Sequence, residues 1–226
     1  DGHTPCVLNG LRVSGGSRLW LSDRYHSAML SFHDANVTMI GCSIGAAFGE
    51  DGVNIKRGEV DIQQCDFRDA QDDIVDLDQV RGRINECSFS ALQRADTSMI
   101  ANGDCLDMSG SRVAITNCIF QGARDKGLSV GERSEAFVRS SSFLNNNTGL
   151  ASKDGSMAYV QGGSFQGNRT GLSAFRKKPV FEGGKIQWQG IVMGGNGTDH
   201  QKDGHSTITT IDKLDPMIAR KFGMDP

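Results

Sequence analysis

The stretch DGVNIKRGEVDIQQCDF, residues 51–67, carries the pattern that specifies the fold of this chain. Its apolar side chains come in three short runs with alternate spacing: Val53 and Ile55, Val60 and Ile62, Cys65 and Phe67. Alternation with a period of two is typical of strands that bury one face. Each run is shorter than a helix requires, and Gly, Asn or Asp stands near the joins. The stretch therefore predicts three short strands joined by tight corners.

The same pattern recurs about every 22 residues along the chain. Its final large apolar residue appears seven times, at Ile44, Phe67, Phe89, Phe120, Phe143, Phe165 and Ile186. A period of this length indicates a solenoid, whose coils bury a continuous core by stacking on one another. We therefore predict an all-β protein, a right-handed parallel β-helix of about seven to eight coils that lie about 4.8 Å apart. A leucine-rich repeat is the alternative, but its lattice of leucines is not found here.

The repeat also suggests where the domain ends. We expect the β-helix to cover residues 1–190 and a capping tail to cover 191–226, with a polar loop over 194–206 and a short helix over 215–222 above the last coil. Residues 1–25 or an upstream segment should cover the other end, where strand edges would be exposed. The longer spacing between Phe89 and Phe120 predicts an insertion over residues 92–103. Because the first residue is Asp, we expect a processed or excised part of a longer chain.

Composition and cysteine spacing narrow the choice of partners and scaffold. The net charge of −3 gives no reason to expect a nucleic-acid partner. No run approaches the roughly 18 apolar residues of a membrane span. Cys42, Cys65, Cys87 and Cys118 occupy one column of the repeat, so we expect a ladder of inward-facing thiols rather than disulfides.

Acidic residues recur at fixed positions of successive coils. Asp51, Asp73 and Asp104 begin three coils at the same corner, and Asp76 and Asp107 follow three residues later on two of them. Adjacent coils would place these carboxylates about 5 Å apart, where they favour a shared proton or a bound cation. Oxygen ligands of this kind suit Ca²⁺, so the five residues predict a calcium site. The alternative is a structural column, because Asp at a tight corner often accepts backbone N–H bonds.

Basic residues follow on the later coils. Lys126 takes the corner position after Asp104, Lys153 lies on the next coil, and Arg176, Lys177 and Lys178 form a cluster beyond them. A lysine beside other cations has a lowered pKa and can act as a general base, so Lys126 and Lys153 are candidate bases. We expect the cluster at 176–178 to bind carboxylates or sulfates of a substrate.

Several coils resemble those of known β-helix proteins. The segments EDGVNIK (50–56), QDDIVDL (71–77), NGDCLDM (102–108), DKGLSVGE (125–132) and TGLASKD (148–154) are similar to coils of the pectate-lyase-like superfamily. Within it they resemble polygalacturonase-type hydrolases, whose coils carry Asp-Gly, Asp-Asp, Gly-His-Gly and Arg-Ile-Lys in that order. Lys126-Gly127 stands here in place of the His-Gly, and Ala151-Ser152-Lys153 in place of the Arg-Ile-Lys. Three segments, DKGLSVGE, GLASKD and FRKKP, also resemble β-helix segments that occur beside spore-coat-H-kinase-like domains.

The resemblance implies a protein that acts on polysaccharides outside the cytoplasm, extracellular or periplasmic. The favoured hypothesis is a lyase that cleaves an acidic, uronate-containing polysaccharide by metal-assisted β-elimination, with Lys126, Lys153, Asp104 and Asp73 in catalysis. The second hypothesis is a glycoside hydrolase that uses two acids of the ladder. The third is a non-catalytic glycan-binding or structural module, since one fold supports many functions.

Overall fold

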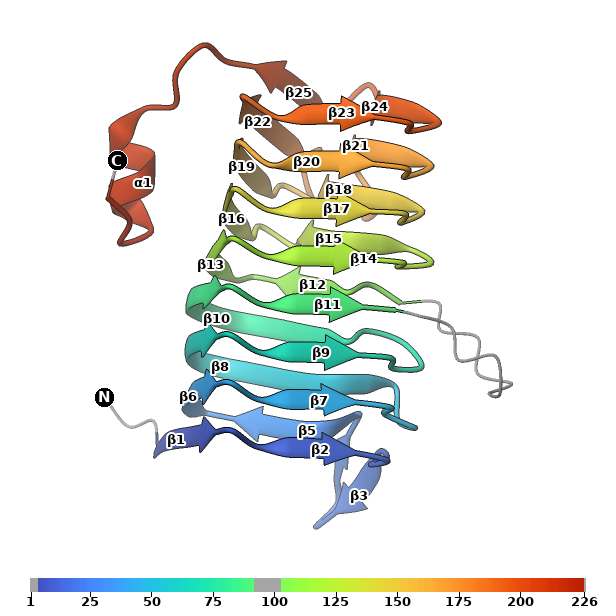
Figure 1. Ribbon diagram of the computed structural model, residues 1–226, viewed down its shortest axis with the longest axis vertical. Helices are drawn as coiled ribbons and strands as arrows, with labels where there is room; N and C mark the ends of the chain where they lie inside the picture. The colour runs from blue at the N-terminus through green and yellow to red at the C-terminus, as the bar shows by residue number, and fades with distance from the viewer. Residues whose placement is uncertain (1–3, 92–102, 226) are drawn as a thin grey trace.

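The computed structural model describes residues 4–91 and 103–225, which wind into a parallel β-helix. Figure 1 shows the coils stacked along the long axis of the molecule. Most strands belong to two parallel sheets, one of 15 strands and one of 8. Each strand of the smaller sheet belongs to a different coil, which agrees with the predicted seven to eight coils. The all-β fold predicted from the repeat is therefore confirmed.

The coil has three faces, each built from one strand per coil. The first face contains β5 (Ala28–His33), β8 (Asp51–Gln63), β10 (Val75–Asn85), β12 (Leu106–Ser109), β15 (Lys126–Gly131), β18 (Thr148–Lys153), β21 (Thr170–Phe175) and β24 (Thr198–Lys202). The second face contains β1 (Thr4–Asn9), β6 (Ala35–Ile40), the later parts of β8 and β10, β13 (Arg112–Thr116), β16 (Glu135–Arg139), β19 (Met157–Gln161), β22 (Lys185–Gln189) and β25 (Thr207–Thr210). The third face, which is the smaller sheet, contains β2 (Arg12–Ser14), β7 (Ser43–Gly45), β9 (Asp66–Arg68), β11 (Ser88–Ser90), β14 (Ile119–Gln121), β17 (Ser142–Leu144), β20 (Ser164–Gln166) and β23 (Val192–Gly194).

Columns of identical side chains fill the interior. The aromatic column comprises Phe67, Phe89, Phe120, Phe143 and Phe165, whose successive rings stack with centroids between 4.5 and 5.1 Å apart. All five rings are fully buried, so the residue used to align the repeat forms the spine of the core. The expected ladder of thiols is confirmed: its four cysteines are buried and free.

Asparagines hold one corner of the later coils. The side-chain amide of Asn146 donates to Asn168 Oδ1 at 3.0 Å, and that of Asn168 donates to Asn196 Oδ1 at 3.0 Å. Asn146 and Asn168 are buried, and their amide groups also bond the carbonyl oxygens of Phe120 and Phe143. A buried amide destabilises the fold unless its hydrogen bonds are satisfied. Because each of these amides bonds the next coil, the ladder fixes how the corners stack.

The winding continues beyond Gly190, where the sequence predicted its end. Strands β23, β24 and β25 pair in parallel with β20, β21 and β22, so a further coil extends to Thr210. The loop predicted over 194–206 is wrong, because it contains β24. All five residues of this strand are exposed and polar, so the strand lacks the apolar pattern from which the repeat was recognised.

The predicted C-terminal helix is confirmed as α1 (Pro216–Lys221), which begins after the N-cap residue Asp215. Its expected position above the last coil is wrong. Phe222 packs instead on the second face, with ring centroids 5.8 Å from Phe137 and 6.4 Å from Tyr159. These two aromatic side chains point outward from β16 and β19, and the tail buries their apolar surface. Figure 1 shows α1 beside these strands.

Residues 4–14 are part of the β-helix and do not form the lid that was expected over 1–25. Strand β1 pairs with β6 and β2 pairs with β7, so residues 4–14 form the first coil. The hairpin of β3 (Leu19–Leu21) and β4 (Arg24–His26) lies at the same end of the molecule in Figure 1. The predicted insertion over 92–103 falls almost entirely outside the described residues. No helix among the described residues is long and apolar enough to cross a membrane.

Candidate functional site

The acidic columns lie on the outer side of the first face. Strand pairing sets Asn54 beside Asp76, Asp76 beside Asp107, and Asp107 beside Ser129 on four successive coils. The backbone N–H of Asp104 donates to Asp73 Oδ1 at 2.6 Å, so the corner column is also continuous. The vertical alignment expected from the repeat length is therefore present.

Three of the five predicted metal ligands converge. One carboxylate oxygen each from Asp73, Asp76 and Asp107 lies within 4.8 Å of the other two. Asp51 and Asp104 are not part of this group. Ser27 Oγ donates to Asp51 Oδ2 at 2.8 Å, and the Asp104 carboxylate accepts from the Lys126 N–H at 2.8 Å and lies 3.3 Å from its ammonium.

Burial makes the ionised form of these acids unfavourable. It raises the pKa of Asp73 to about 9, with further repulsion from Asp104 and Asp107. It also raises the pKa of Asp76 to about 8, with repulsion from Asp78 next. The pKa of Asp51 rises to about 6, mainly through burial, although the hydrogen bond from Ser27 opposes the rise. Near neutral pH the carboxyl groups of Asp73 and Asp76 therefore hold protons unless another positive charge replaces them.

The donor set fits a hard divalent cation. Carboxylate oxygens are preferred ligands of Ca²⁺, which tolerates irregular geometry. Asn54 Nδ2 donates to Asp76 Oδ2 at 2.5 Å and orients that carboxylate. Next to Asp107, the hydroxyl of Ser129 is fully buried and has no hydrogen-bond partner among the described residues. An unpartnered buried hydroxyl beside a cluster of carboxyl groups indicates a site suited to a further polar or charged group.

Lys126 is held by acids rather than by cations. Its ammonium pairs with Asp104 and with Asp125. The residue as a whole is only 7% exposed. Burial tends to lower the pKa of Lys126, but the charges of Asp104 and Asp125 outweigh it, and the net pKa is raised. The lowered pKa expected for this lysine is therefore wrong, because its nearest charged groups are carboxylates.

Lys153 reaches the acidic cluster from two coils away. Its ammonium lies 3.5 Å from Asp107 Oδ1, although the residues are 46 positions apart in the sequence. The side chain crosses Gly131 on the intervening coil, where an added Cβ would lie 2.6 Å from Lys153 Cε. The glycine thus leaves the space through which the lysine approaches the carboxylate.

The basic cluster at 176–178 follows β21. Lys178 forms an ion pair with Glu132, and Arg176 Nη2 lies 2.8 Å from His205 Nε2. The backbone N–H groups of Lys177 and Lys178 both donate to Asp154 Oδ1 at 2.7 Å, which fixes the turn. The hydrogen bond to Glu132 raises the pKa of Lys178, desolvation opposes the rise, and the charges of Glu132 and Asp154 add to it.

A groove of about 420 Å³ adjoins the acids and includes residues that the sequence analysis missed. Tyr25, Glu50 and Asp72 line it with the acids, and Tyr25 Oη donates to Glu50 Oε1 at 2.6 Å. Lys56 also lines it and forms an ion pair with Asp78 at 2.8 Å. Lys56 and Asp78 lie beside each other on neighbouring coils, two residues after Asn54 and Asp76. The repeat could therefore have predicted this ion pair. Tyr25 belongs to a hairpin outside the repeat and left no periodic signal.

The chain belongs to the right-handed β-helix family, because the family model described as "Right handed beta helix region" matches residues 27–186. No curated protein matches the chain.

Among solved structures, the pectate lyase Pel9A is similar with a TM-score of 0.46 and 11% identity, over 80% of this chain and 55% of that one. The Dettilon tailspike protein gp208 is similar with a TM-score of 0.45 and 10% identity, over 92% of this chain and 54% of that one. This chain thus spans about half the length of each.

Proposed function

We propose that this protein is a polysaccharide lyase that cleaves a uronate-containing polysaccharide by metal-assisted β-elimination. The observation that supports this proposal is the meeting of a three-carboxylate cluster with a buried lysine, Lys153, at Asp107. β-Elimination needs an acidified α-proton and a nearby base, and these two groups can supply both.

Asp73, Asp76 and Asp107 would hold Ca²⁺. Bound there, Ca²⁺ would polarise the uronate carboxylate and acidify the proton on the adjacent carbon. Asn54 would keep Asp76 oriented, and the buried hydroxyl of Ser129 would offer a further oxygen beside Asp107. Asp104 would hold Lys126 and keep the corner in place.

Lys153 is the better candidate for the base. Lys126 is paired with two carboxylates, and its raised pKa keeps it protonated at neutral pH. The Lys153 ammonium faces Asp107, which is one of the proposed ligands.

The remaining cations would bind the acidic chain of the substrate. Among the described residues, the Lys177 side chain makes no ion pair, so it is free to meet a uronate carboxylate, with Arg176 and Lys178 on either side. An acidic polymer as substrate agrees with this arrangement and with an extracellular or periplasmic location, which is part of the proposal.

A hydrolase is the second candidate, favoured by the raised pKa of Asp73. At about 9, this pKa keeps the carboxyl group protonated at neutral pH, as a general acid requires. Its distance from Asp76 and Asp107, within 4.8 Å between oxygen atoms, is close to the roughly 5 Å separation of retaining pairs.

The test is an assay on soluble polyuronates with Ca²⁺ present, following both the ultraviolet absorbance of an unsaturated product and the release of reducing ends. A lyase gives both signals, and a hydrolase gives reducing ends alone. Lys153→Ala should abolish the absorbance signal, whereas Lys185→Ala, whose lysine pairs with exposed Glu182, should retain it. Binding of polyuronate without either signal would refute both enzymatic proposals and favour the non-catalytic module.

A further inference from the structure

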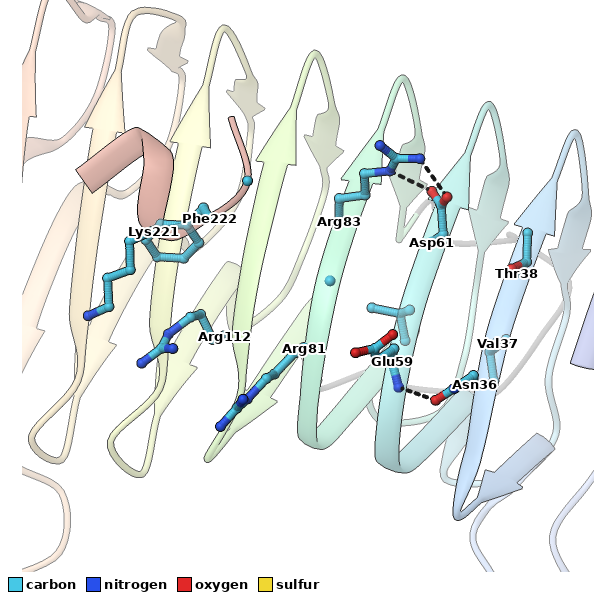
Figure 2. A pocket seen from close by; sticks show the side chains of 13 residues that line it. Asn36, Val37, Thr38, Glu59, Asp61, Arg81, Arg83, Arg112, Lys221 and Phe222 are labelled. Atoms are coloured by element: carbon cyan, nitrogen blue, oxygen red, sulfur yellow. Dashed lines mark hydrogen bonds and ion pairs between the residues drawn. The ribbon is translucent and has the colours of Figure 1, made fainter. Parts of the chain in front are cut away.

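A second groove lies on the second face of the coil, around the corner from the acidic cluster. It has a volume of about 520 Å³, within the range of roughly 300–1,000 Å³ typical of ligand sites. Strands β6, β8, β10 and β13 form its floor, and Lys221, Phe222 and Gly223 of the C-terminal tail form one wall. Figure 2 shows this arrangement.

Most charged groups around this groove already have partners. Arg83 forms two hydrogen bonds with the Asp61 carboxylate, at 2.9 and 2.7 Å. Arg112 and Lys221 share the carboxylate of Glu135, at 2.7 and 2.6 Å. One carboxylate therefore balances two cations at the end of the groove nearest α1.

Arg81 is the cation without an ion pair among the described residues. Strand pairing sets it between Glu59 and Arg112, yet it lies within ion-pair distance of no described carboxylate. Figure 2 shows the side chains of Arg81, Arg112 and Lys221 directed to the same side of the groove. A guanidinium group that is free in such a groove offers a planar pair of donors to an incoming oxyanion.

The other lining groups suit the rest of a sugar ring. Phe222 presents an aromatic ring at the wall, held there by its contact with Phe137. Asn36 and Thr38 line the opposite end and carry groups that can bond hydroxyls. An apolar wall with a few polar groups and a cation that forms no ion pair is the usual composition of a site for a small organic anion.

We propose that this groove binds an acidic sugar unit, with its carboxylate or sulfate group on Arg81 and its ring against Phe222. The groove shares no residue with the Asp73, Asp76 and Asp107 cluster, so it is a second site and does not depend on the proposed lyase activity. Its wall exists because the tail docks on β16 and β19, which gives the tail a role in binding as well as in covering Phe137.

Calorimetric titration with EDTA present tests the site, since the chelator removes any contribution of a divalent cation at the acidic cluster. The probes are a trigalacturonate, a sulfated disaccharide, neutral maltotriose and inorganic sulfate. We expect one or both acidic sugars to bind, and maltotriose not to bind. The two acidic probes separate a carboxylate from a sulfate as the recognised group. Inorganic sulfate that binds as tightly as either sugar would overturn the role of the ring.

Three variants sharpen the test. Arg81→Gln should weaken binding about tenfold or more, because it removes a charged bidentate donor. Glu59→Gln should strengthen binding, because it removes the carboxylate next in register to Arg81. Arg124→Gln is the matched control, an exposed arginine outside the groove with no ion pair among the described residues.

Phe222→Ala should weaken the binding of the acidic sugars more than the binding of inorganic sulfate. Equal affinities of Arg81→Gln and Arg124→Gln, with both proteins folded by circular dichroism, would overturn the proposal.

Discussion

Calcium should stabilise this protein, and the size of the effect can be worked out from the cluster. Three carboxylates with loose geometry resemble a weak, extracellular type of calcium site, for which Kd values of roughly 10⁻⁴–10⁻³ M are typical. At about 10 mM Ca²⁺, mass action then adds about 1.4–2.7 kcal/mol to the free energy of unfolding. For a domain of this size, Tm rises by about 2–4 °C per kcal/mol, so this gain corresponds to a rise in Tm of about 3–11 °C.

The assay is thermal unfolding followed by circular dichroism, with Ca²⁺ or with EDTA, at pH 8. Asp76→Asn should lose the calcium-dependent rise, because it removes one of three converging oxygens. Asp212→Asn, which alters an exposed acid beyond the last strand, should keep it. A rise of equal size in both variants would refute the cluster as the site, and so would the absence of any rise in the unaltered protein at pH 8.

Three further outcomes follow from the structure. Without metal, stability should fall as pH rises from about 4 to about 9. The pKa values of Asp73 and Asp76 are raised in the folded state to about 9 and about 8, so the folded protein holds these protons more tightly than the unfolded chain. The Tm should therefore be lower at pH 8.5 than at pH 5.5. Gly131→Ala should displace Lys153 from Asp107 and lower the elimination rate at least tenfold. The control Gly204→Ala, with nothing within 4 Å of the added Cβ, should leave the elimination rate unchanged. Phe120→Ala should cost about 3–5 kcal/mol in urea unfolding, because it breaks the buried aromatic column in its middle; a loss below 1 kcal/mol would contradict that role.

The sequence alone determined the alignment of neighbours one coil apart. Because one repeat equals one turn, the spacing of about 22 residues is sufficient to set Phe67 against Phe89, and the longer spacing of 31 residues still sets Asp76 against Asp107. The same periodicity identified the fold class, the ladder of thiols and the columns of acids. It failed at the last coil, where exposed polar residues replaced the apolar pattern on which the alignment depends.

Only the tertiary structure decided which charged groups meet across two coils and what covers the outer faces. Lys153 reaches Asp107 because a glycine on the intervening coil leaves room for its long side chain, a relation that no fixed period encodes. The C-terminal tail packs on Phe137 rather than over the last coil of the β-helix, and so creates the groove beside Arg81. The physical reason is one of range. Backbone pairing repeats locally with the chain, whereas side-chain reach, burial and protonation depend on everything packed around a site.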